Sequence, residues 1–401
     1  MTERIFLADS HCFTCEARVL SCEAQADGTF SAVFDRTVFF PNKGGQPCDI
    51  GTAGTARVTD CNEKDGELVH TLDSALTVGE TVTLSIDRER RLDIMRQHTG
   101  EHLLSWTMWE LYGAVNVGFH CALDYATLDA DKPLDAEQIR AMEAMANAVV
   151  MDNRPVTAKI YETEAELEGV KLRKHTEGLE APIRVVTVEN ADSCTCCAPH
   201  VKFTGEIGLI KIIQFASYKG GTRVTFLCGG RALSYVNRQS ETVKLLANRF
   251  STAAEKLPEI MEKQCAELED LKKKNKSLSA DLELYLTAEL KQKAEQIKGI
   301  ALLAETVKTD VKRLRPLAQS TLTEKSITLL LAENGGQTGY VLVSRGLKED
   351  MGAWLQAVNA ATGGKGGGRG DMAQGSCAGA VSPETLEQLR QYMRSRCRDI
   401  K

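Results

Sequence analysis

Short runs of alternating hydrophobic and polar residues fill the first part of the chain. The runs at 17–20, 37–40 and 82–86 are separated by turn residues, many of them glycine. Alternation places every second side chain on one face of a strand, and regularly spaced short strands are typical of a small barrel or a strongly curved sheet. Residues 1–88 are therefore predicted to form a small β-barrel-like domain.

The hydrophobic period changes to that of a helix near residue 87. Leu92, Met95, Leu103 and Trp106 can share one helical face, which predicts a helix over 87–111. Further along, the pattern predicts a second helix at 134–150 and strands at 156–161, 183–188, 207–213 and 223–227. This mixture of helices and strands predicts an α+β domain over 89–236.

Residues 237–299 are charged and predict a long helical segment. From Met261 the core positions of about three heptads are mostly apolar, with Asn275 at one of them. Coiled coils use such a polar residue to fix their register. The segment is therefore either a coiled-coil dimer seam or a helical hairpin packed within the chain, and the pattern favours neither.

From residue 300 onward apolar strands alternate with helical segments, which predicts a small α/β domain over 300–401. Between its last two helices lies a glycine-rich run, 363–375, that contains Lys365 and Arg369. Such a run is either a flexible linker or a loop that presents backbone N–H groups and positive charge to phosphate. No Ser or Thr follows the Gly-Lys pair, so the run is not a nucleotide P-loop.

The composition limits the class of protein. The chain has 401 residues, of which 43% are hydrophobic and 26% charged, so it can bury ordinary globular cores. A net charge of −6 argues against indiscriminate binding to polyanions. No apolar run approaches the roughly 20 residues of a membrane span, and no signal peptide is recognisable at the N-terminus. Thirteen cysteines in such a chain predict reduced thiols and a cytoplasmic protein.

Two clusters of metal-ligand residues are the strongest chemical signal. His98 and His102 are four residues apart in a predicted helix, so both imidazoles can face one ion. About 90 residues downstream, Cys196 and His200 have the Cys-x3-His spacing, with Cys194 as a rival thiolate. Four N and S ligands of this kind favour zinc, and four protein ligands are more typical of a structural than of a catalytic zinc site.

Two competing motifs carry less weight. The segment 98–102 also matches His-x-x-Glu-His, the inverted zinc-protease pattern, in which Glu101 would be the general base. That family takes its remaining ligand from a distant Glu, whereas a Cys/His cluster suits zinc better. Cys12 and Cys15 form a Cys-x2-Cys pair, but no second pair exists to complete a zinc ribbon.

Four segments resemble, in order, parts of the alanyl-tRNA synthetase family. Segment 37–51 is similar to the Thr-x-Phe-Tyr-Pro…Gly-Gly-Gln…Asp-x-Gly stretch that precedes the editing domain. Segment 98–104 is similar to the His-x3-His helix, and 196–208 to the Cys-x3-His-Val…Thr-Gly-Glu-Ile-Gly run. Segment 366–374 resembles the glycine-rich Asp-Met-Ala-Gln motif of the C-terminal domain. No aminoacylation domain precedes them, so the chain is similar to the free-standing alanyl-tRNA editing proteins of the long form.

Some positions depart from the family pattern. Residues 196–200 read Cys-Cys-Ala-Pro-His where the family usually has Cys-Gly-Gly-Thr-His. Phe40 stands in place of Tyr, and Gly370 in place of Pro. The ligand spacing is preserved, so these changes bear on fine specificity more than on the class of reaction.

The resemblance implies a zinc-dependent hydrolase that removes a wrong amino acid, chiefly serine with glycine as a second candidate, from tRNA(Ala). Zinc would polarise or position a water molecule, or hold the substrate amine. Selection of serine against alanine needs a group that hydrogen-bonds the hydroxyl, and Thr37 and Gln46 are the candidates. Their alternative role is to hold the turn together. Glu101 would orient water or hydrogen-bond a ligand imidazole.

The implied partner is the acceptor end of tRNA(Ala), with Lys365 and Arg369 contacting phosphate and with no role for DNA or membrane. A homodimer through the helical segment and the C-terminal domain is the expected assembly if the heptads pair between chains. Two other functions stay open. One is a non-catalytic tRNA-binding protein with a structural zinc, which would unfold on metal removal. The other is removal of serine from tRNA(Thr), because that editing domain has a similar ligand pattern.

Overall fold

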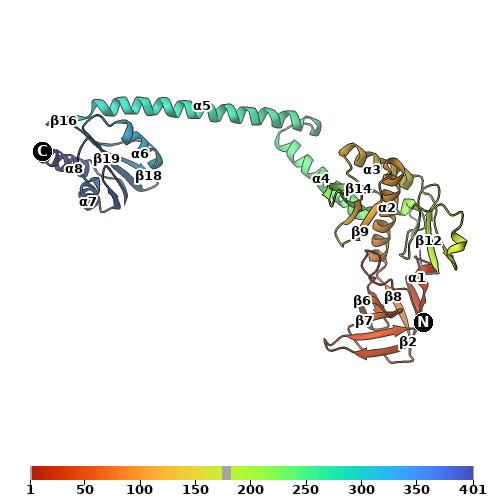
Figure 1. Cartoon of the computed structure of the whole chain (residues 1–401). Coiled ribbons are helices and arrows are strands. Elements are labelled where there is room, and N and C mark those ends of the chain that lie inside the picture. Colours follow the sequence, from red (N-terminus) through yellow and green to blue (C-terminus); the bar gives the residue numbers. More distant parts are fainter. Residues whose placement is uncertain (1, 174–181, 401) are drawn as a thin grey trace. The chain divides into compact units, whose positions relative to one another are not determined.

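The computed structural model describes residues 2–173 and 182–400 of the chain (Figure 1). The chain divides into two compact units, Met1–Ala254 and Glu255–Lys401. Among the described helices, none is both long and apolar enough to cross a membrane.

The first unit begins with a closed six-stranded barrel, which confirms the predicted barrel. Its strands pair in the order β2-β3-β7-β6-β5-β8, each antiparallel to its neighbours. The small and apolar side chains of the alternating pattern fill its interior, among them Phe34, Val58 and Leu84. The strands are β2 (Thr14–Ala24), β3 (Phe30–Phe34), β5 (Gly51–Ala53), β6 (Ala56–Lys64), β7 (Glu67–Leu72) and β8 (Thr81–Ile86), preceded by β1 (Glu3–Arg4) and α1 (Ile5–Ala8), with β4 (Arg36–Thr37) paired to β1.

A buried ion pair joins the barrel to the long helix α2 (Arg88–Tyr112). The Arg91 guanidinium donates to both carboxylate oxygens of Asp49 and to the carbonyl of Val38, and Arg91 is only 1% exposed. Asp49 also accepts from the backbone N–H of Phe40 at 2.7 Å. The Asp-x-Gly segment of the sequence therefore fixes where α2 leaves the barrel.

Helix α2 is the centre of the α+β part of the first unit. Asp87 caps its N-terminus by accepting from the Arg90 N–H, and Gly113 ends it in the left-handed conformation. Every residue from Gln97 to Met108 is buried, polar ones included, so the helix is enclosed rather than amphipathic. Its surroundings are α3 (Ala136–Met151), a sheet of order β14 (Ile210–Tyr218), β15 (Gly221–Cys228), β10 (Ala126–Ala130), β9 (Asn116–Cys121), and a sheet of order β11 (Val156–Tyr161), β12 (Ile183–Val188), β13 (Ser193–Thr195).

Three features of this region differ from the sequence-based expectation. Strands β9, β10 and β13 were not predicted; β9 is a short run, Asn-Val-Gly-Phe-His-Cys, in which glycine weakens the strand signal although apolar residues alternate. The strand predicted from 207 begins at Ile210, since 3-10 helix η2 (Thr204–Ile207) occupies the preceding residues. A further 3-10 helix, η1 (Glu164–Leu167), follows β11.

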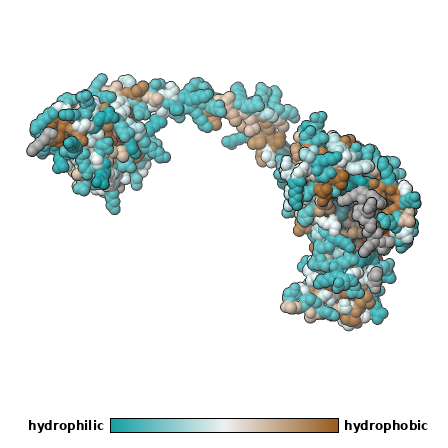
Figure 2. Space-filling model, viewed as in Figure 1, coloured by the Kyte–Doolittle hydropathy of each residue, from teal (hydrophilic) through white to brown (hydrophobic). Residues whose placement is uncertain are grey.

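The predicted helical segment consists of two helices, α4 (Gly229–Arg249) in the first unit and α5 (Leu257–Gln292) in the second, with 3-10 helix η3 (Ala254–Lys256) before α5. Figure 2 shows apolar surface along α4, and both helices expose large apolar side chains: Leu233, Val236, Val243, Leu245, Leu246, Phe250, Met261, Leu268, Leu271, Leu278, Leu282, Leu284 and Tyr285. The coiled coil stays a prediction.

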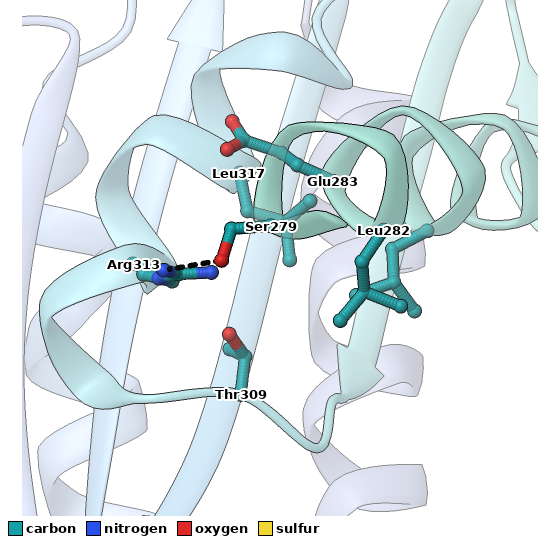
Figure 3. Close-up of a pocket in the computed structure, with 7 residues that line it drawn as sticks. Ser279, Leu282, Glu283, Thr309, Arg313 and Leu317 are labelled. Atoms are coloured by element: carbon teal, nitrogen blue, oxygen red, sulfur yellow. Dashed lines mark hydrogen bonds between the residues drawn. The ribbon is translucent and has the colours of Figure 1, made fainter. Parts of the chain in front are cut away.

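The second unit is built on a six-stranded mixed sheet of order β16-β17-β18-β19-β21-β20. Helices α7 and α8 cover one face, and α6 with the end of α5 covers the other. Figure 3 shows α5 against α6, where Arg313 donates to the Ser279 hydroxyl at 3.0 Å beside Leu317. The elements are β16 (Glu295–Ile297), β17 (Ile300–Thr306), α6 (Val311–Ser320), β18 (Ser326–Asn334), β19 (Gln337–Arg345), α7 (Met351–Thr362), β20 (Lys365–Arg369), β21 (Met372–Ala378) and α8 (Pro383–Asp399).

The glycine-rich run forms edge strand β20 rather than a linker. Its Gly366 and Gly368 pack so closely on β21 that an added Cβ would lie 2.3 Å from the Gln374 carbonyl or the Ala373 Cα. Close approach of the two backbones therefore explains why Gly366 and Gly368 are glycines. It does not explain Gly367, because nothing lies within 4 Å of a Cβ added there.

Candidate metal centre

The structure brings His98, His102, Cys196 and His200 together, as the sequence predicted. One ligand atom from each residue lies within 4.8 Å of all the others. His98 and His102 come from α2, and Cys196 and His200 come from the loop that follows β13. All three histidines are buried, and Cys196 is partly buried.

The spacing of the four ligand atoms suits a tetrahedral zinc ion. The Cys196 Sγ lies 3.6 Å from His98 Nε2 and 3.3 Å from His200 Nε2. Zinc bonds of about 2.3 Å to sulfur and about 2.0 Å to nitrogen would separate the two atoms by roughly 3.5 Å at a tetrahedral angle. Both measured distances from the Cys196 sulfur are therefore close to the value that a shared tetrahedral zinc ion requires.

Each histidine ring is held through its other nitrogen. His98 Nδ1 lies 2.6 Å from Gln46 Oε1, and His200 Nδ1 lies 3.0 Å from the Thr99 hydroxyl. His102 Nδ1 lies 3.1 Å from a carboxylate oxygen of Asp192, an ion-pair contact without ideal hydrogen-bond geometry. Partners of this kind fix the imidazole orientation and leave Nε2 free to bind a metal.

The electrostatics of the cluster favour the ligand forms of Cys196 and His200. Burial alone would raise the pKa of the Cys196 thiol, but its interactions with the imidazoles of His98, His200 and His102 outweigh burial and hold that pKa well below its usual value. Burial lowers the pKa of His200 to about 3, so its imidazole is neutral. A thiolate and neutral imidazoles are the forms that coordinate zinc.

His102 has a pKa that is shifted in the opposite direction to the pKa of His200. Burial lowers its pKa, but the Asp192 carboxylate and Cys196 outweigh burial and raise the pKa well above the usual value. Asp192 is itself held by Arg173, whose guanidinium donates to it at 2.7 and 3.2 Å. A cation bound to the four ligands would compete with protons for His102, which would make its binding pH-dependent.

Cys196, rather than Cys194, is the thiol in the cluster. The Cys194 Sγ donates to the Thr195 carbonyl at 3.6 Å, and burial raises its pKa. Arg184 holds the Cys196 loop by donating to the carbonyls of Cys196 and Ala198, each at 2.9 Å. The loop therefore keeps its ligand spacing although it lacks the usual glycines.

A cleft of about 360 Å³ opens beside the cluster. Its lining residues are Gly44, His98, Glu101, His102, Asn116, Val117, Gly118, Phe119, Arg173, Cys194, Thr195 and Cys196. The barrel loop contributes Gly44 to this lining, and the carbonyl of the adjacent Gly45 accepts from the Cys121 N–H at 2.6 Å. Gly45 has φ +78°, and an added Cβ would lie 2.4 Å from the Phe119 carbonyl oxygen, so only glycine fits this approach.

Comparisons with known proteins agree with this geometry. Residues 183–225 match the threonyl and alanyl tRNA synthetase second additional domain, and residues 299–399 match the DHHA1 domain. The alanyl-tRNA editing protein AlaX-L of Pyrococcus horikoshii is 30% identical over 98% of this chain and 100% of its own length. The chain belongs to the alanyl-tRNA editing protein family.

Other relatives include both free-standing and synthetase-linked forms. The alanyl-tRNA editing protein Aarsd1-B of Xenopus laevis is 29% identical over 90% of this chain and 88% of its own length. The alanine–tRNA ligase of Thermococcus kodakarensis is 29% identical over 98% of this chain but only 44% of the ligase. This member of the editing family thus corresponds to part of that ligase and to most of the length of the two free-standing relatives named above.

The two residues predicted to recognise a serine hydroxyl have other contacts. Thr37 is fully buried in the barrel, with its hydroxyl 2.9 Å from His70 Nε2, and it does not line the cleft. Gln46 is buried and its amide oxygen is engaged by His98. Both residues thus contact other side chains of the protein, and recognition of the serine hydroxyl by Thr37 and Gln46 stays a prediction.

Lys365 and Arg369 belong to the second unit, where both are exposed on strand β20. Lys365 lies two residues before Gly367 and Arg369 lies two residues after it. Because side chains alternate along a strand, all three residues occupy one face. The strand carries positive charge at both ends of that face.

Several partners of the site were not found from the sequence. The only hint to Asp192 in the sequence was its position four residues before Cys196. A carboxylate close to a candidate ligand is a weak signal. Asn116 and Ser105 hydrogen-bond Glu101, and no local pattern identified them. Asn116 lies in strand β9, which was not predicted, and Ser105 lies in the part of α2 that is buried on all sides.

Proposed function

We propose that the chain is a trans-editing hydrolase that cleaves the ester of a wrongly attached amino acid, chiefly serine and then glycine, on tRNA(Ala). The observation that carries the proposal is the three-histidine, one-cysteine cluster beside a cleft. The names of the relatives, which state alanyl-tRNA editing, support the choice of tRNA(Ala).

His98, His102, Cys196 and His200 would hold a zinc ion, which supplies a Lewis acid next to the ester carbonyl. The chain's own residues keep the ligands in place: Gln46, Thr99 and Asp192 orient the three imidazoles. In the reaction, water adds to the carbonyl carbon and the bond to the ribose oxygen breaks. The tRNA leaves with a free hydroxyl and the amino acid leaves as its acid. Because an aminoacyl ester is already activated, modest catalysis suffices.

The test is deacylation of Ser-tRNA(Ala) and Ala-tRNA(Ala) by the full chain. We expect the wild type to release serine faster than alanine, and a Cys196→Ala, His200→Ala variant to lose this activity. The matched control is Cys197→Ala, since Cys197 is exposed and adjacent to Cys196 but outside the cluster. Undiminished serine release by the double variant would overturn the site assignment.

Two rival functions are separated by the same assay. A tRNA-binding protein with a structural zinc would deacylate nothing, and chelation would unfold its first unit. The complete set of four protein ligands is the observation that favours this rival. An enzyme for tRNA(Thr) would prefer Ser-tRNA(Thr) to Ser-tRNA(Ala) in a panel of mischarged tRNAs.

The remaining parts of the proposal concern organisation. Residues 1–88, 89–236, 237–299 and 300–401 would act as barrel, editing domain, helical segment and tRNA-binding domain of a cytoplasmic protein. Lys365 and Arg369 would contact tRNA phosphates. The exposed apolar side chains of α5 support pairing of two copies through the helical segment, which sedimentation analysis of the full chain would test.

A further inference from the structure

Glu101 is a buried carboxylate without a cationic partner among the described residues. It is 4% exposed, and its Oε1 accepts from Asn116 Nδ2 at 2.6 Å and from the Ser105 hydroxyl. Both donors are neutral, and no described Lys, Arg or His lies within ion-pair distance of it. The nearby Arg173 directs its guanidinium to Asp192. Buried carboxylates are ordinarily paired with a cation or a metal.

The second carboxylate oxygen of Glu101 faces the cleft. No described group donates to Oε2, and Glu101 lines the cleft together with His98 and His102. Ser105 and Asn116 hold Oε1, and Asn116 is itself fixed, because its Oδ1 accepts from the Gly118 N–H at 2.8 Å. The carboxylate is thus held in one orientation, with one oxygen available to a ligand.

We propose that Glu101 Oε2 binds the α-ammonium group of the aminoacyl ester, so that the cleft accepts esters with a free amine and refuses N-acylated ones. This inference rests on the proposed function. The α-amine is two bonds from the ester carbonyl carbon. Glu101 lies between His98 and His102 on α2, so an ester whose carbonyl is held beside these histidines would have its amine next to Glu101. Asn116 and Ser105 are positioning residues for this carboxylate.

Charge favours the amine over the serine hydroxyl or water as the ligand of Glu101. Arg173 and His102 pair with Asp192 and act on Glu101 only from a longer distance, so an ammonium group would give this carboxylate its first direct ion pair, whereas a hydroxyl or water would give it only a neutral hydrogen bond. A charge-assisted hydrogen bond is also roughly twice as strong as a neutral one. An N-acyl group removes the charge and adds bulk at the same position. A deacylase with this selectivity would spare esters that carry a growing peptide.

The first experiment needs no variant. The full chain is given Ser-tRNA(Ala) and N-acetyl-Ser-tRNA(Ala), and each rate is divided by the uncatalysed rate in the same buffer, because the amine itself activates the ester. We expect the normalised kcat/KM for the free-amine ester to be higher by roughly 10- to 100-fold, the range of one charge-assisted hydrogen bond. Equal normalised values would overturn the inference while the proposed function stands. No hydrolysis of either ester would overturn both.

The second experiment uses Glu101→Gln, with Gly-tRNA(Ala) as a third substrate. The amide oxygen can still accept from Asn116 and Ser105, which turns the amide NH2 toward the cleft and against the ammonium. We expect kcat/KM for the seryl and glycyl esters to fall by the same factor of 10 or more, with the N-acetyl ester unchanged. A fall for the seryl ester alone would assign Glu101 to the hydroxyl, and an equal fall for all three would assign it to water. Either result overturns the inference.

Binding gives a readout that does not depend on turnover. The probe is 3′-seryl-amino-adenosine, an amide that cannot be hydrolysed as the ester is, with and without an N-acetyl group. We expect the wild type to bind the free-amine probe at least 10-fold more tightly, and Glu101→Gln to bind the two alike. The matched control is Glu110→Gln, an exposed glutamate near the end of α2, which should keep the wild-type ratio. A wild-type ratio near one would contradict the proposal.

Discussion

The amide oxygen of Gln46 lies 2.6 Å from Nδ1 of His98, so a loop of the barrel directly orients a residue of the candidate metal site. The loop is fixed on its other side, where the Gly45 carbonyl accepts from Cys121 in β9. The Gly-Gly-Gln segment therefore connects the barrel to the site through one backbone and one side-chain contact.

Replacing Gln46 should weaken metal binding. Gln46→Leu removes the acceptor for the His98 N–H, so the imidazole can rotate or change tautomer, and we expect zinc affinity to fall roughly 10- to 100-fold. Gln46→Glu keeps an acceptor and should retain most of the affinity. Competition with a chromophoric chelator measures both. Gln25→Leu, at an exposed position of the same barrel, is the control, and an unchanged affinity of Gln46→Leu would refute the orienting role.

Gly100 allows α2 to pack against strand β15. An added Cβ would lie 2.3 Å from the Cys228 Sγ, so Gly100→Ala should lower the free energy of unfolding by about 1–3 kcal/mol, although alanine is the better helix former. Adding Cys228→Ala removes the sulfur and should restore most of the loss. Urea unfolding measures this cycle. Gly230→Ala, whose Cβ meets nothing within 4 Å, should be neutral or stabilising. A single variant as stable as the wild type would exclude the steric contact.

His70 should make the barrel less stable in acid. Burial lowers its pKa from 6.5 to about 4. Between these values the unfolded chain binds a proton that the folded chain does not, so stability falls as the pH falls from about 6.5 to about 4. We expect His70→Gln, which can still reach the Thr37 hydroxyl, to reduce the slope by up to about 1.4 kcal/mol per pH unit. Unfolding in urea across this range measures it.

The control for the acid prediction is His120→Gln. His120 is exposed on β9, so its substitution should leave the dependence of stability on pH as in the wild type. An identical slope for His70→Gln and the wild type would mean that His70 is not the titrating group.

Lys365 and Arg369 should contribute to tRNA affinity through phosphate contacts. Lys365→Ala with Arg369→Ala should weaken binding and lower the slope of log affinity against log salt by roughly one per lost contact, because fewer counterions are released. Filter binding of tRNA(Ala) at several salt concentrations measures the slope. Arg345→Ala with Lys348→Ala, two exposed cations of the same unit, is the matched control. An equal slope in all three proteins would argue against a phosphate site on β20.

Much of the fold followed from local patterns. The alternating runs predicted the barrel, and the helical period predicted α2 and α3 to within a few residues, since burial of one face leaves its period in the sequence. Strand β9 was missed although Val117, Phe119 and Cys121 alternate with more polar positions, because the run is short and glycine weakens a strand signal. Its role is to line the cleft and to receive the Gly45 loop, and neither role requires a hydrophobic face.

The sequence by itself determined the three histidines and the short segment that supplies the thiol, because the spacings of His98 to His102 and of Cys196 to His200 are local and the residue types suit zinc. Only the tertiary structure decided which thiol joins them and what holds each imidazole. Gln46 reaches His98 across 52 residues, and Thr99 reaches His200 across 101. It also turned one oxygen of Glu101 toward the cleft. Such contacts arise from the packing of enclosed elements against one another, and no periodicity along the chain records them.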